Sequence, residues 1–359
     1  MIKKRTYIIA EAGVNHNGSL DLAIELVDAA VKSGADAIKF QTFKSESLVS
    51  KSAPKSDYQL KTTELGESQL EMLKKLELSV SDHYELKKIC DKYGIEFLST
   101  PFDFDSLDLL ERQMGMETIK ISSGDLSSAP FLLAAAKTKK RIILSTGLSC
   151  LGEIETALGV LAFGLVGGVE MPSIKKFKDA YTSSEGQALL QKHVSLLHCT
   201  TEYPTPYDEV NLKAMDTLKA AFQLPVGLSD HTEGIAIPIA AVAIGATIIE
   251  KHFTLDRNLP GPDHKASLDA KELKAMVAGI RQVEMALGSG IKTPAPSELK
   301  NMHVARKSLI ATKKIAIGDI YTEDNIGIKR PGNGLAPIHY WEMLGKSAMH
   351  NFDEDDLLE

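Results

Sequence analysis

The sequence predicts an α/β protein made of a (β/α)8 TIM barrel followed by a small β-rich domain. Eight short strand-like segments alternate with amphipathic segments up to about residue 287, as is typical of parallel βαβ units closed into a barrel. Beyond that point a proline-rich segment and short β-like runs replace the alternation. We therefore expect a barrel domain at 1–287, a linker at 288–300 and a second domain at 301–359.

The expected strands are short apolar runs bounded by helical or turn-forming segments. In chain order they are Tyr7–Ala12, Ala37–Thr42, Ile95–Pro101, Thr118–Ser123, Arg141–Thr146, Val194–Thr200, Val226–His231 and Thr247–Phe253. Amphipathic helices are expected between them, for example at Leu20–Ser33 and Asp82–Tyr93, with Gly34 and Gly94 as C-caps. A doubly wound parallel sheet is the alternative arrangement of the same units.

The remaining segments are less regular. The sequence Thr293–Ser297 (TPAPS) predicts a linker, and β-like runs follow at Ser308–Thr312 and Ile326–Lys329. About sixty residues is small for an independent core, so we expect the second domain to dock on something larger. The stretch Leu165–Lys192 is long for a barrel connection, and we interpret it as a surface excursion without an assigned role.

The composition is that of an ordinary globular protein. Of the 359 residues 43% are hydrophobic and 25% are charged, and the formal net charge is −7. With no basic block and a single Trp, nucleic acid is not an expected partner. The longest apolar run, near 235–249, is interrupted by Pro238 and Gly245 and is too short to cross a bilayer, so no membrane association is expected.

The cysteines and the N-terminus indicate a cytoplasmic protein. Cys90, Cys150 and Cys199 are odd in number, far apart and without CxxC spacing, which argues against a disulfide or structural zinc framework. Met1–Arg5 is basic, but only a short apolar stretch follows before Glu11, so no signal peptide is expected.

The carboxyl ends of all eight expected strands are polar, although a packed core would favour apolar residues there. Side chains two apart on a strand share a face, and the carboxyl ends of barrel strands meet at one mouth. The sequence therefore predicts a site at this mouth. Its expected members are Glu11, Lys39 with Gln41, Ser99 with Thr100, Lys120 with Ser122, Ser145 with Thr146, Ser229 with His231, and Glu250 with His252.

Lys39 and Lys120 would be buried cations at this mouth and therefore need a negative partner. A structural ion pair with Glu11 is one interpretation of Lys39. The pair of lysines taken with the neighbouring hydroxyl groups favours an anionic substrate such as a phosphate or carboxylate.

Two histidines end adjacent expected strands. His231 and His252 can approach each other, and two imidazoles completed by oxygen ligands suit a labile divalent cation such as Mn²⁺. Hydrogen-bonded interior histidines are the alternative. His198 and Cys199 are further candidate ligands, although Cys199 also fits a small thiol in the core.

Two further candidates lie outside the strands. Asp263, in Gly261–Lys265 (GPDHK), follows the eighth strand and is expected over the same mouth, with a turn-capping role as the alternative. Arg330 lies in a Pro/Gly turn of the second domain and is a candidate site residue. A solvated surface charge is the alternative interpretation.

An ordered series of motifs carries a resemblance to a known family. It runs over IAEAGVNHNG (9–18), KFQT (39–42), LSTPF (98–102), LSTG (144–147), HCTTEYPTP (198–206), GLSDHT (227–232), EKHF (250–253), GPD (261–263) and KRPGNG (329–334). Together these segments resemble the bacterial sialic acid synthases, nearly from end to end. KFQTF (39–43), YQLKTT (58–63) and GPDHKASL (261–268) are more similar to the legionaminic acid synthases of that family than to the N-acetylneuraminic acid synthases.

The resemblance implies a TIM barrel joined to a C-terminal antifreeze-like (SAF) domain, in a domain-swapped homodimer whose small domains close the partner's barrel. The implied reaction condenses phosphoenolpyruvate with an N-acylated mannosamine-type sugar and water, giving a nine-carbon 2-keto sugar acid (N-acetylneuraminate or legionaminate) and phosphate. The implied divalent cofactor is Mn²⁺ or Mg²⁺, held by His231 and His252. The implied catalytic residues are Glu11, which would position or deprotonate the attacking water, and Asp263.

The remaining implied site residues bind the two substrates. Those for phosphoenolpyruvate are Lys39, Lys120, Ser123, Ser145 and Ser229, with Thr100 also at the substrate site. Those for the sugar are Gln41, Asp125, Tyr203 and Asp263, with Arg330 of the partner at its N-acyl end. Asp125 departs from the family, which commonly has Glu there, and the 165–192 segment is a second departure. Both bear on the identity of the sugar rather than on the reaction type.

Two other functions fit parts of the pattern. A metal-dependent aldolase or hydrolase on a TIM barrel would leave the two lysines without a highly charged anion. A non-catalytic sugar-binding protein would bind ligand and form no product. The sequence leaves open whether the acceptor is N-acetylmannosamine or its 2,4-diacetamido-2,4,6-trideoxy relative, and which metal is physiological.

Overall fold

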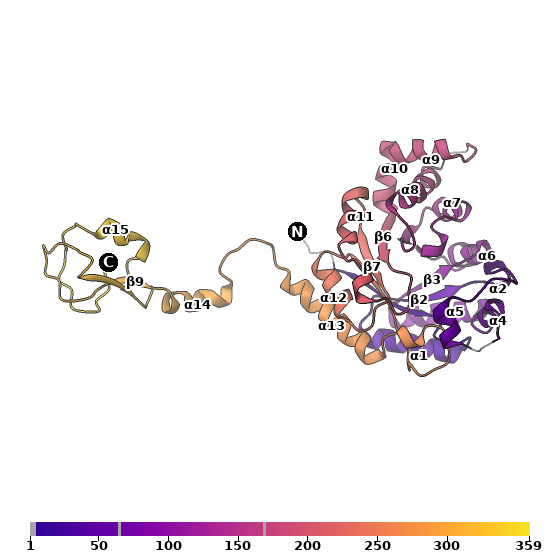
Figure 1. The fold of residues 1–359 in the computed structure, drawn as a ribbon, viewed down its shortest axis with the longest axis horizontal. Helices are drawn as coiled ribbons and strands as arrows, with labels where there is room; N and C mark the ends of the chain where they lie inside the picture. The colour runs from indigo at the N-terminus through magenta and orange to yellow at the C-terminus, as the bar shows by residue number, and fades with distance from the viewer. Residues whose placement is uncertain (1–4, 64–65, 168–169) are drawn as a thin grey trace. The chain divides into compact units, whose positions relative to one another are not determined.

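The computed structural model describes residues 5–63, 66–167 and 170–359, so that part of the basic N-terminal segment Met1–Arg5 lies outside the described residues. The chain divides between Gly288 and Ser289 into two compact units. The first unit contains eight parallel strands with helices around them (Figure 1). None of the described helices is long and apolar enough to cross a bilayer.

The eight strands form one parallel sheet in the order β3-β2-β1-β8-β7-β6-β5-β4. Their bounds are β1 (Tyr7–Gly13), β2 (Ala37–Thr42), β3 (Glu96–Pro101), β4 (Thr118–Ile121), β5 (Arg141–Ser145), β6 (Val194–Cys199), β7 (Val226–Asp230) and β8 (Ile248–His252). The end strands β3 and β4 lie against each other, and Thr118 Oγ1 donates a hydrogen bond to Glu96 Oε1 between them at 3.2 Å. The predicted barrel is confirmed, and the doubly wound alternative is wrong.

Each strand lies within a few residues of its predicted position. The largest difference is at β4, which ends at Ile121, two residues before the predicted Ser123. There the Ser122 hydroxyl donates to Asp125 Oδ2 at 2.6 Å, and residues Ser123–Asp125 form a single 3-10 turn. This local side-chain bond draws the chain out of the sheet as soon as the strand leaves the barrel.

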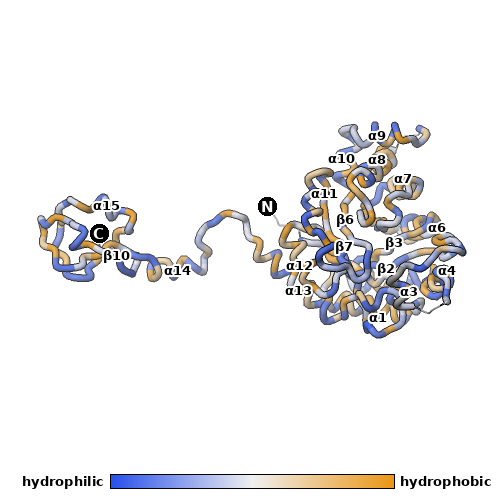
Figure 2. Tube along the Cα trace, in the orientation of Figure 1, coloured by the Kyte–Doolittle hydropathy of each residue, from blue (hydrophilic) through white to orange (hydrophobic). Residues whose placement is uncertain are grey.

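The bounds of the helices of the barrel unit are α1 (Leu20–Ser33), α2 (Ser45–Leu48), α3 (Asp57–Thr62), α4 (Gln69–Lys74), α5 (Val80–Tyr93), α6 (Phe104–Asp108), α7 (Ala129–Lys137), α8 (Leu151–Val166), α9 (Ile174–Thr182), α10 (Ser184–His193), α11 (Ala214–Phe222), α12 (Ala236–Ala243) and α13 (Ala270–Ala286). The longer helices pack around the outside of the sheet, whereas the short helices α2, α3 and α4 lie in the connection between β2 and α5. Gly34 and Gly94 end α1 and α5 in the left-handed conformation, as predicted. Along α13 hydrophobic and hydrophilic residues alternate (Figure 2), and its buried residues include Leu273, Met276 and Ile280.

The long connection before β6 is helical. The residues 165–192 comprise the end of α8, then α9 and most of α10, with 168–169 outside the described residues. Phe177 of α9 packs edge-on against Phe163 of α8, with ring centroids 5.5 Å apart. The excursion therefore adds a helical pair to the outer layer of the barrel unit.

The second unit has a core of its own. Helix α14 (Pro296–Ala305) begins inside the segment predicted as a linker, because Glu298 reaches back to accept from the backbone N–H of Ala295. After it, β9 (Ser308–Ala311) and β10 (Ile326–Lys329) pair antiparallel, and α15 (Tyr340–Met343) follows. The core of the second unit is formed by Leu309, Ala311, Ile315, Tyr321, Ile326, Ala348, Phe352 and Leu358.

Candidate active site

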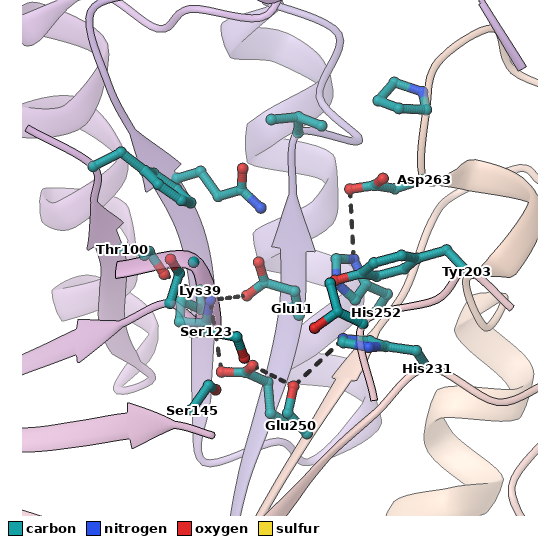
Figure 3. A pocket seen from close by; sticks show the side chains of 18 of the residues that line it. Glu11, Lys39, Thr100, Ser123, Ser145, Tyr203, His231, Glu250, His252 and Asp263 are labelled. Atoms are coloured by element: carbon teal, nitrogen blue, oxygen red, sulfur yellow. Dashed lines mark hydrogen bonds and ion pairs between the residues drawn. The ribbon is translucent and has the colours of Figure 1, made fainter. Parts of the chain in front are cut away.

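A cavity of about 290 Å³ opens at the carboxyl ends of the barrel strands (Figure 3). The register of the sheet explains which side chains reach it. Glu11 of β1 lies beside both Lys39 of β2 and His252 of β8, and Ser229 of β7 lies beside Glu250 of β8. Alternation along β8 then directs Glu250 and His252 to the same side. The predicted mouth is therefore one contiguous site.

The floor of the cavity is a cluster of two buried lysines and two buried glutamates. Lys39 Nζ lies 2.7 Å from Glu11 Oε2 and 3.6 Å from Glu250 Oε2. Lys120 Nζ lies 3.5 Å from Glu250 Oε1, and Ser229 donates to the same oxygen at 2.8 Å. Glu250 therefore lies between the two lysines. The ion pair considered as an alternative for Lys39 is present, and it forms part of this larger cluster.

Hydroxyl groups complete the lysine environment. Lys39 Nζ donates to Thr100 Oγ1 at 2.9 Å, and Lys120 Nζ donates to Ser145 Oγ at 2.8 Å. The Ser123 hydroxyl accepts from the backbone N–H of Gly147 at 3.0 Å. Ammonium, hydroxyl and backbone donors at one end of a cavity are the groups that bind phosphate and carboxylate oxygens.

The two glutamates differ in their expected charge. Burial raises the pKa of Glu11 to about 7, and the field of Lys39 offsets only part of that rise. Burial also acts on Glu250, but Lys120 and Lys39 outweigh it and lower the pKa of Glu250 to about 2. Glu250 is therefore an anion across the physiological range, whereas Glu11 is poised to exchange a proton near neutral pH.

The two histidines lie beside this cluster, with ring centroids 5.4 Å apart. His231 Nδ1 donates to the backbone oxygen of Thr200 at 2.7 Å, which leaves the lone pair on Nε2, 3.5 Å from the Ser229 hydroxyl. His252 Nδ1 is buried and has no hydrogen-bond partner, and it lies 3.8 Å from Asp263 Oδ2. The ring of Tyr203 lies over His231 with centroids 4.1 Å apart and the two planes tilted by 33°.

The two histidine nitrogens can bind a divalent cation only if oxygen atoms of other groups complete its coordination sphere. Among the described residues no group of three His, Cys, Asp or Glu side chains is arranged to hold a metal ion by itself. Of the further candidates, Cys199 lines the cavity with its sulfur 3.9 Å from His231 Nδ1. His198 instead bonds the backbone oxygen of Val210 through Nε2.

Asp263 is held at the mouth by two sequence motifs that meet in space. The Ser267 hydroxyl donates to the backbone oxygen of Asp263 at 2.7 Å, and Asn15 Nδ2 donates to that hydroxyl at 2.9 Å. His264 contacts Asn17 Oδ1 at 3.1 Å. Segment 15–17 after β1 therefore fixes the loop after β8 that presents Asp263.

Gly13 ends β1 at the centre of this arrangement, with φ of +54°. A Cβ at this position would lie 3.3 Å from Glu11 Oε1, 3.4 Å from His252 Cε1 and 3.5 Å from Asp263 Oδ2. Glycine is favoured here by the positive φ, and an added Cβ would fit only closely beside Glu11.

Most predicted site residues border the cavity. Those in its lining are Glu11, Lys39, Gln41, Thr100, Lys120, Ser123, Ser145, Tyr203, Ser229, His231, His252 and Asp263. Asp125 does not line it and touches it only through Ser122. Arg330 is exposed in the second unit, directly after β10. Glu250, which strand alternation placed at the mouth without a specific role, also lines the cavity. The prediction missed further lining residues from α3, α4 and the connecting loops, namely Val14, Gln59, Met72, Leu73, Leu76, Phe102 and Thr201.

Comparison with protein families matches residues 26–292 to the NeuB family and residues 306–359 to the SAF domain. The chain belongs to the NeuB family. The resemblance predicted from the motifs is confirmed, as is the SAF domain at the C-terminus.

NeuB relatives cover the whole chain. An N,N'-diacetyllegionaminic acid synthase of Campylobacter jejuni is 51% identical over 99% of both chains. One from Legionella pneumophila is 45% identical over 96% of this chain and 91% of its own. The crystal structure of an N-acetylneuraminic acid synthetase from Leptospira borgpetersenii, in complex with citrate, superposes with a TM-score of 0.66 at 35% identity, over 83% of this chain and 90% of that one. This chain is therefore a synthase of the sialic acid type, and the aldolase or hydrolase alternative finds no support.

Proposed function

We propose that this chain condenses phosphoenolpyruvate with 2,4-diacetamido-2,4,6-trideoxymannose and water, giving N,N'-diacetyllegionaminic acid and phosphate. The observation that carries the proposal is the convergence of Lys39, Lys120 and their hydroxyl partners on one cavity beside the two histidines. The names of the two relatives above support this acceptor.

Phosphoenolpyruvate, with about three negative charges, is proposed to bind on the floor of the cavity. We assign Lys120 and Ser145 to the phosphate and Lys39 and Thr100 to the carboxylate. Each lysine already has a hydroxyl partner within 2.9 Å, so that each pair offers two donors to an anion. Ser123 and Ser229 would supply further hydroxyl donors. This arrangement needs no large rearrangement of the floor, since the strand register fixes the lysines.

In the proposed reaction, C3 of the enol attacks the aldehyde carbon of the open-chain sugar, and the positive charge that develops at C2 is offset by Glu250. Water adds to C2 as Glu11 takes one of its protons, and this proton is returned to the former aldehyde oxygen, which becomes a hydroxyl. The bond from C2 to the phosphate oxygen then breaks, the remaining proton of the C2 hydroxyl leaves with the phosphate, and C2 becomes the keto carbon. Gln41, Tyr203 and Asp263 are proposed to hold the sugar. Asp125 would join them through Ser122, and Arg330 of a domain-swapped partner would contact the N-acyl end.

His231 and His252 are proposed to hold Mn²⁺ or Mg²⁺. The buried, unpartnered Nδ1 of His252 and the lone pair on Nε2 of His231 support this assignment. When bound, the cation would polarise the aldehyde oxygen of the sugar. We also propose a cytoplasmic location, which agrees with the three free cysteines.

The test is phosphate release from phosphoenolpyruvate with Mn²⁺, Mg²⁺ or Co²⁺, with each acceptor or with none. We expect release only when metal and an N-acyl hexosamine are both present, and a product whose mass is that of the diacetamido 2-keto acid. His231→Ala should lower kcat at least about a hundredfold, because the aldehyde loses its electrophilic support. His193→Ala, at the opposite end of the barrel, is the matched control. Release without acceptor, or none with any acceptor, would contradict the proposal.

A further inference from the structure

A small hydrophobic cluster, separate from the main barrel core, lies beside the active-site cavity. Its members Val14, Met72, Leu73, Leu76 and Phe102 also line the cavity, and we call these five residues the apolar wall. Val14 follows β1 and Phe102 follows β3, while the other three come from α4 and the turn after it. The wall therefore stands over the strand ends β1 to β3 of a cavity whose floor is charged.

The wall is held from behind by polar contacts. Glu67, just before α4, accepts ion pairs from Lys55 at 2.9 Å and Lys75 at 2.7 Å. Beyond α4, Glu77 accepts a hydrogen bond from the backbone N–H of Ser45 at 2.6 Å. Both ends of the segment that carries Met72 are thus held by contacts with residues 45 and 55, which also lie in the connection between β2 and α5. The wall is therefore a preformed surface.

Under the proposed function, the end of the mannosamine acceptor that does not react would extend toward this wall. The aldehyde carbon must lie at the floor, near Lys39 and the histidines, so carbons four to six extend toward the mouth. N-acetylmannosamine carries hydroxyl groups there, and the wall offers them no polar partner among its own side chains. The trideoxy relative carries a methyl group at carbon six and the methyl of a second acetamido group, both of which gain from contact with buried apolar carbon.

We propose that the apolar wall is a specificity determinant, which selects acceptors whose distal end carries methyl groups over acceptors that carry hydroxyls. This inference rests on the proposed function, and it assigns acceptor choice to residues that take no part in the carbon–carbon bond formation. The expected discrimination is moderate, about ten- to a hundredfold in kcat/KM, since an apolar pocket rejects an added hydroxyl only to that extent.

The experiment compares kcat/KM for the two acceptors in four variants of the full chain. Met72→Gln and Leu73→Asn introduce polar atoms of nearly the same size into the wall. Met72→Leu keeps it apolar, and Met285→Gln places the same polar change on an exposed position of α13. Leu73 is only half-buried, so that its variant tests the proposal even if Met72→Gln folds poorly.

We expect the parent chain to favour the trideoxy acceptor. Met72→Gln and Leu73→Asn should lower the ratio of the two kcat/KM values about tenfold, whereas Met72→Leu and Met285→Gln should leave that ratio within about twofold. The inference is overturned if the parent favours N-acetylmannosamine, if the wall variants keep the parent ratio, or if both wall variants raise the KM for phosphoenolpyruvate in parallel with that for the sugar. If neither acceptor supports phosphate release, the proposed function itself has failed.

Discussion

Lys120 and Lys251 are both almost fully buried in the barrel, yet their surroundings differ. Lys251 of β8 points away from the cavity. Its Nζ lies 2.6 Å from Asp230 Oδ2 and also donates to the backbone oxygen of Thr232. The second oxygen of Asp230 accepts from the backbone N–H of Thr232 at 3.1 Å. Both charged groups of this pair therefore have partners within the protein, and the Thr232 hydroxyl adds a further hydrogen bond to Asp230 Oδ2.

The cluster around Lys120 is open by comparison. Lys120 approaches Glu250 only to 3.5 Å, and Glu250 Oε2 is buried without a hydrogen-bond partner. This cluster borders a cavity, whereas Lys251 does not line it. Burial of a lysine therefore does not by itself distinguish a structural role from ligand binding. A closed, fully matched pair indicates a structural role, and an incompletely matched cluster beside a cavity indicates a ligand.

Breaking the closed ion pair between Lys251 and Asp230 should reduce the stability of the protein most. Lys251→Met would leave Asp230 buried without its cation, and we expect the free energy of unfolding to fall by about 3–5 kcal/mol. Urea denaturation measures this loss. The double variant Asp230→Asn with Lys251→Met removes both charges and should recover part of it. A loss below about 1 kcal/mol for Lys251→Met would contradict the structural role of this pair, because the pair would then contribute little to folding.

Substitution of Lys120 in the open cluster should lower activity more than it lowers stability. Lys120→Met removes a donor to the proposed phosphate, so we expect kcat/KM for phosphoenolpyruvate to fall about 10²–10³-fold. The same variant should change the free energy of unfolding far less than Lys251→Met does, because Glu250 retains Ser229 and lies near Lys39. Lys137→Met, exposed at the end of α7, is the matched control. Strong destabilisation with little loss of activity would reverse the two assignments.

The smallest expected effect is a pH dependence of the open cluster. Since burial raises the pKa of Glu11 to about 7 and the proposed base must be ionised, protonation removes activity as the pH falls. We expect kcat/KM to decrease about tenfold for each pH unit below 7. Measuring the binding of phosphoenolpyruvate alone over the same pH range distinguishes protonation of the substrate from protonation of Glu11. A profile that stays flat between pH 5.5 and 8 would argue against Glu11 as the base.

The sequence predicted the barrel and most of the cavity because both depend on local patterns. Strand-like runs, alternation along each strand and the convergence of parallel strand ends placed residues such as Lys39, Lys120 and His231 on one mouth. Glu250 followed from the same alternation, since it shares a face with His252. Its importance lies in its distances to two lysines of other strands, which only the closed barrel provides.

The apolar wall could not be predicted in the same way. Val14, Met72 and Phe102 are far apart in the sequence, and each looks like an ordinary core residue. Their meeting depends on how the excursion between β2 and α5 folds back over the strand ends, which no local periodicity encodes. Asp125 shows the converse, because a side-chain bond to Ser122 turns the chain out of β4 and takes Asp125 off the cavity lining.

The space beside Gly13 has a consequence for engineering the acceptor range of this synthase. Residues of the apolar wall border the cavity from one side, so libraries at those positions can vary the shape of the site while the reacting groups stay in place. A side chain at residue 13 would instead have to adopt a positive φ, and its Cβ would lie against Glu11, whose carboxylate belongs to the charged floor. Positions that can be diversified and a position that favours glycine are therefore adjacent in the chain, at Val14 and Gly13.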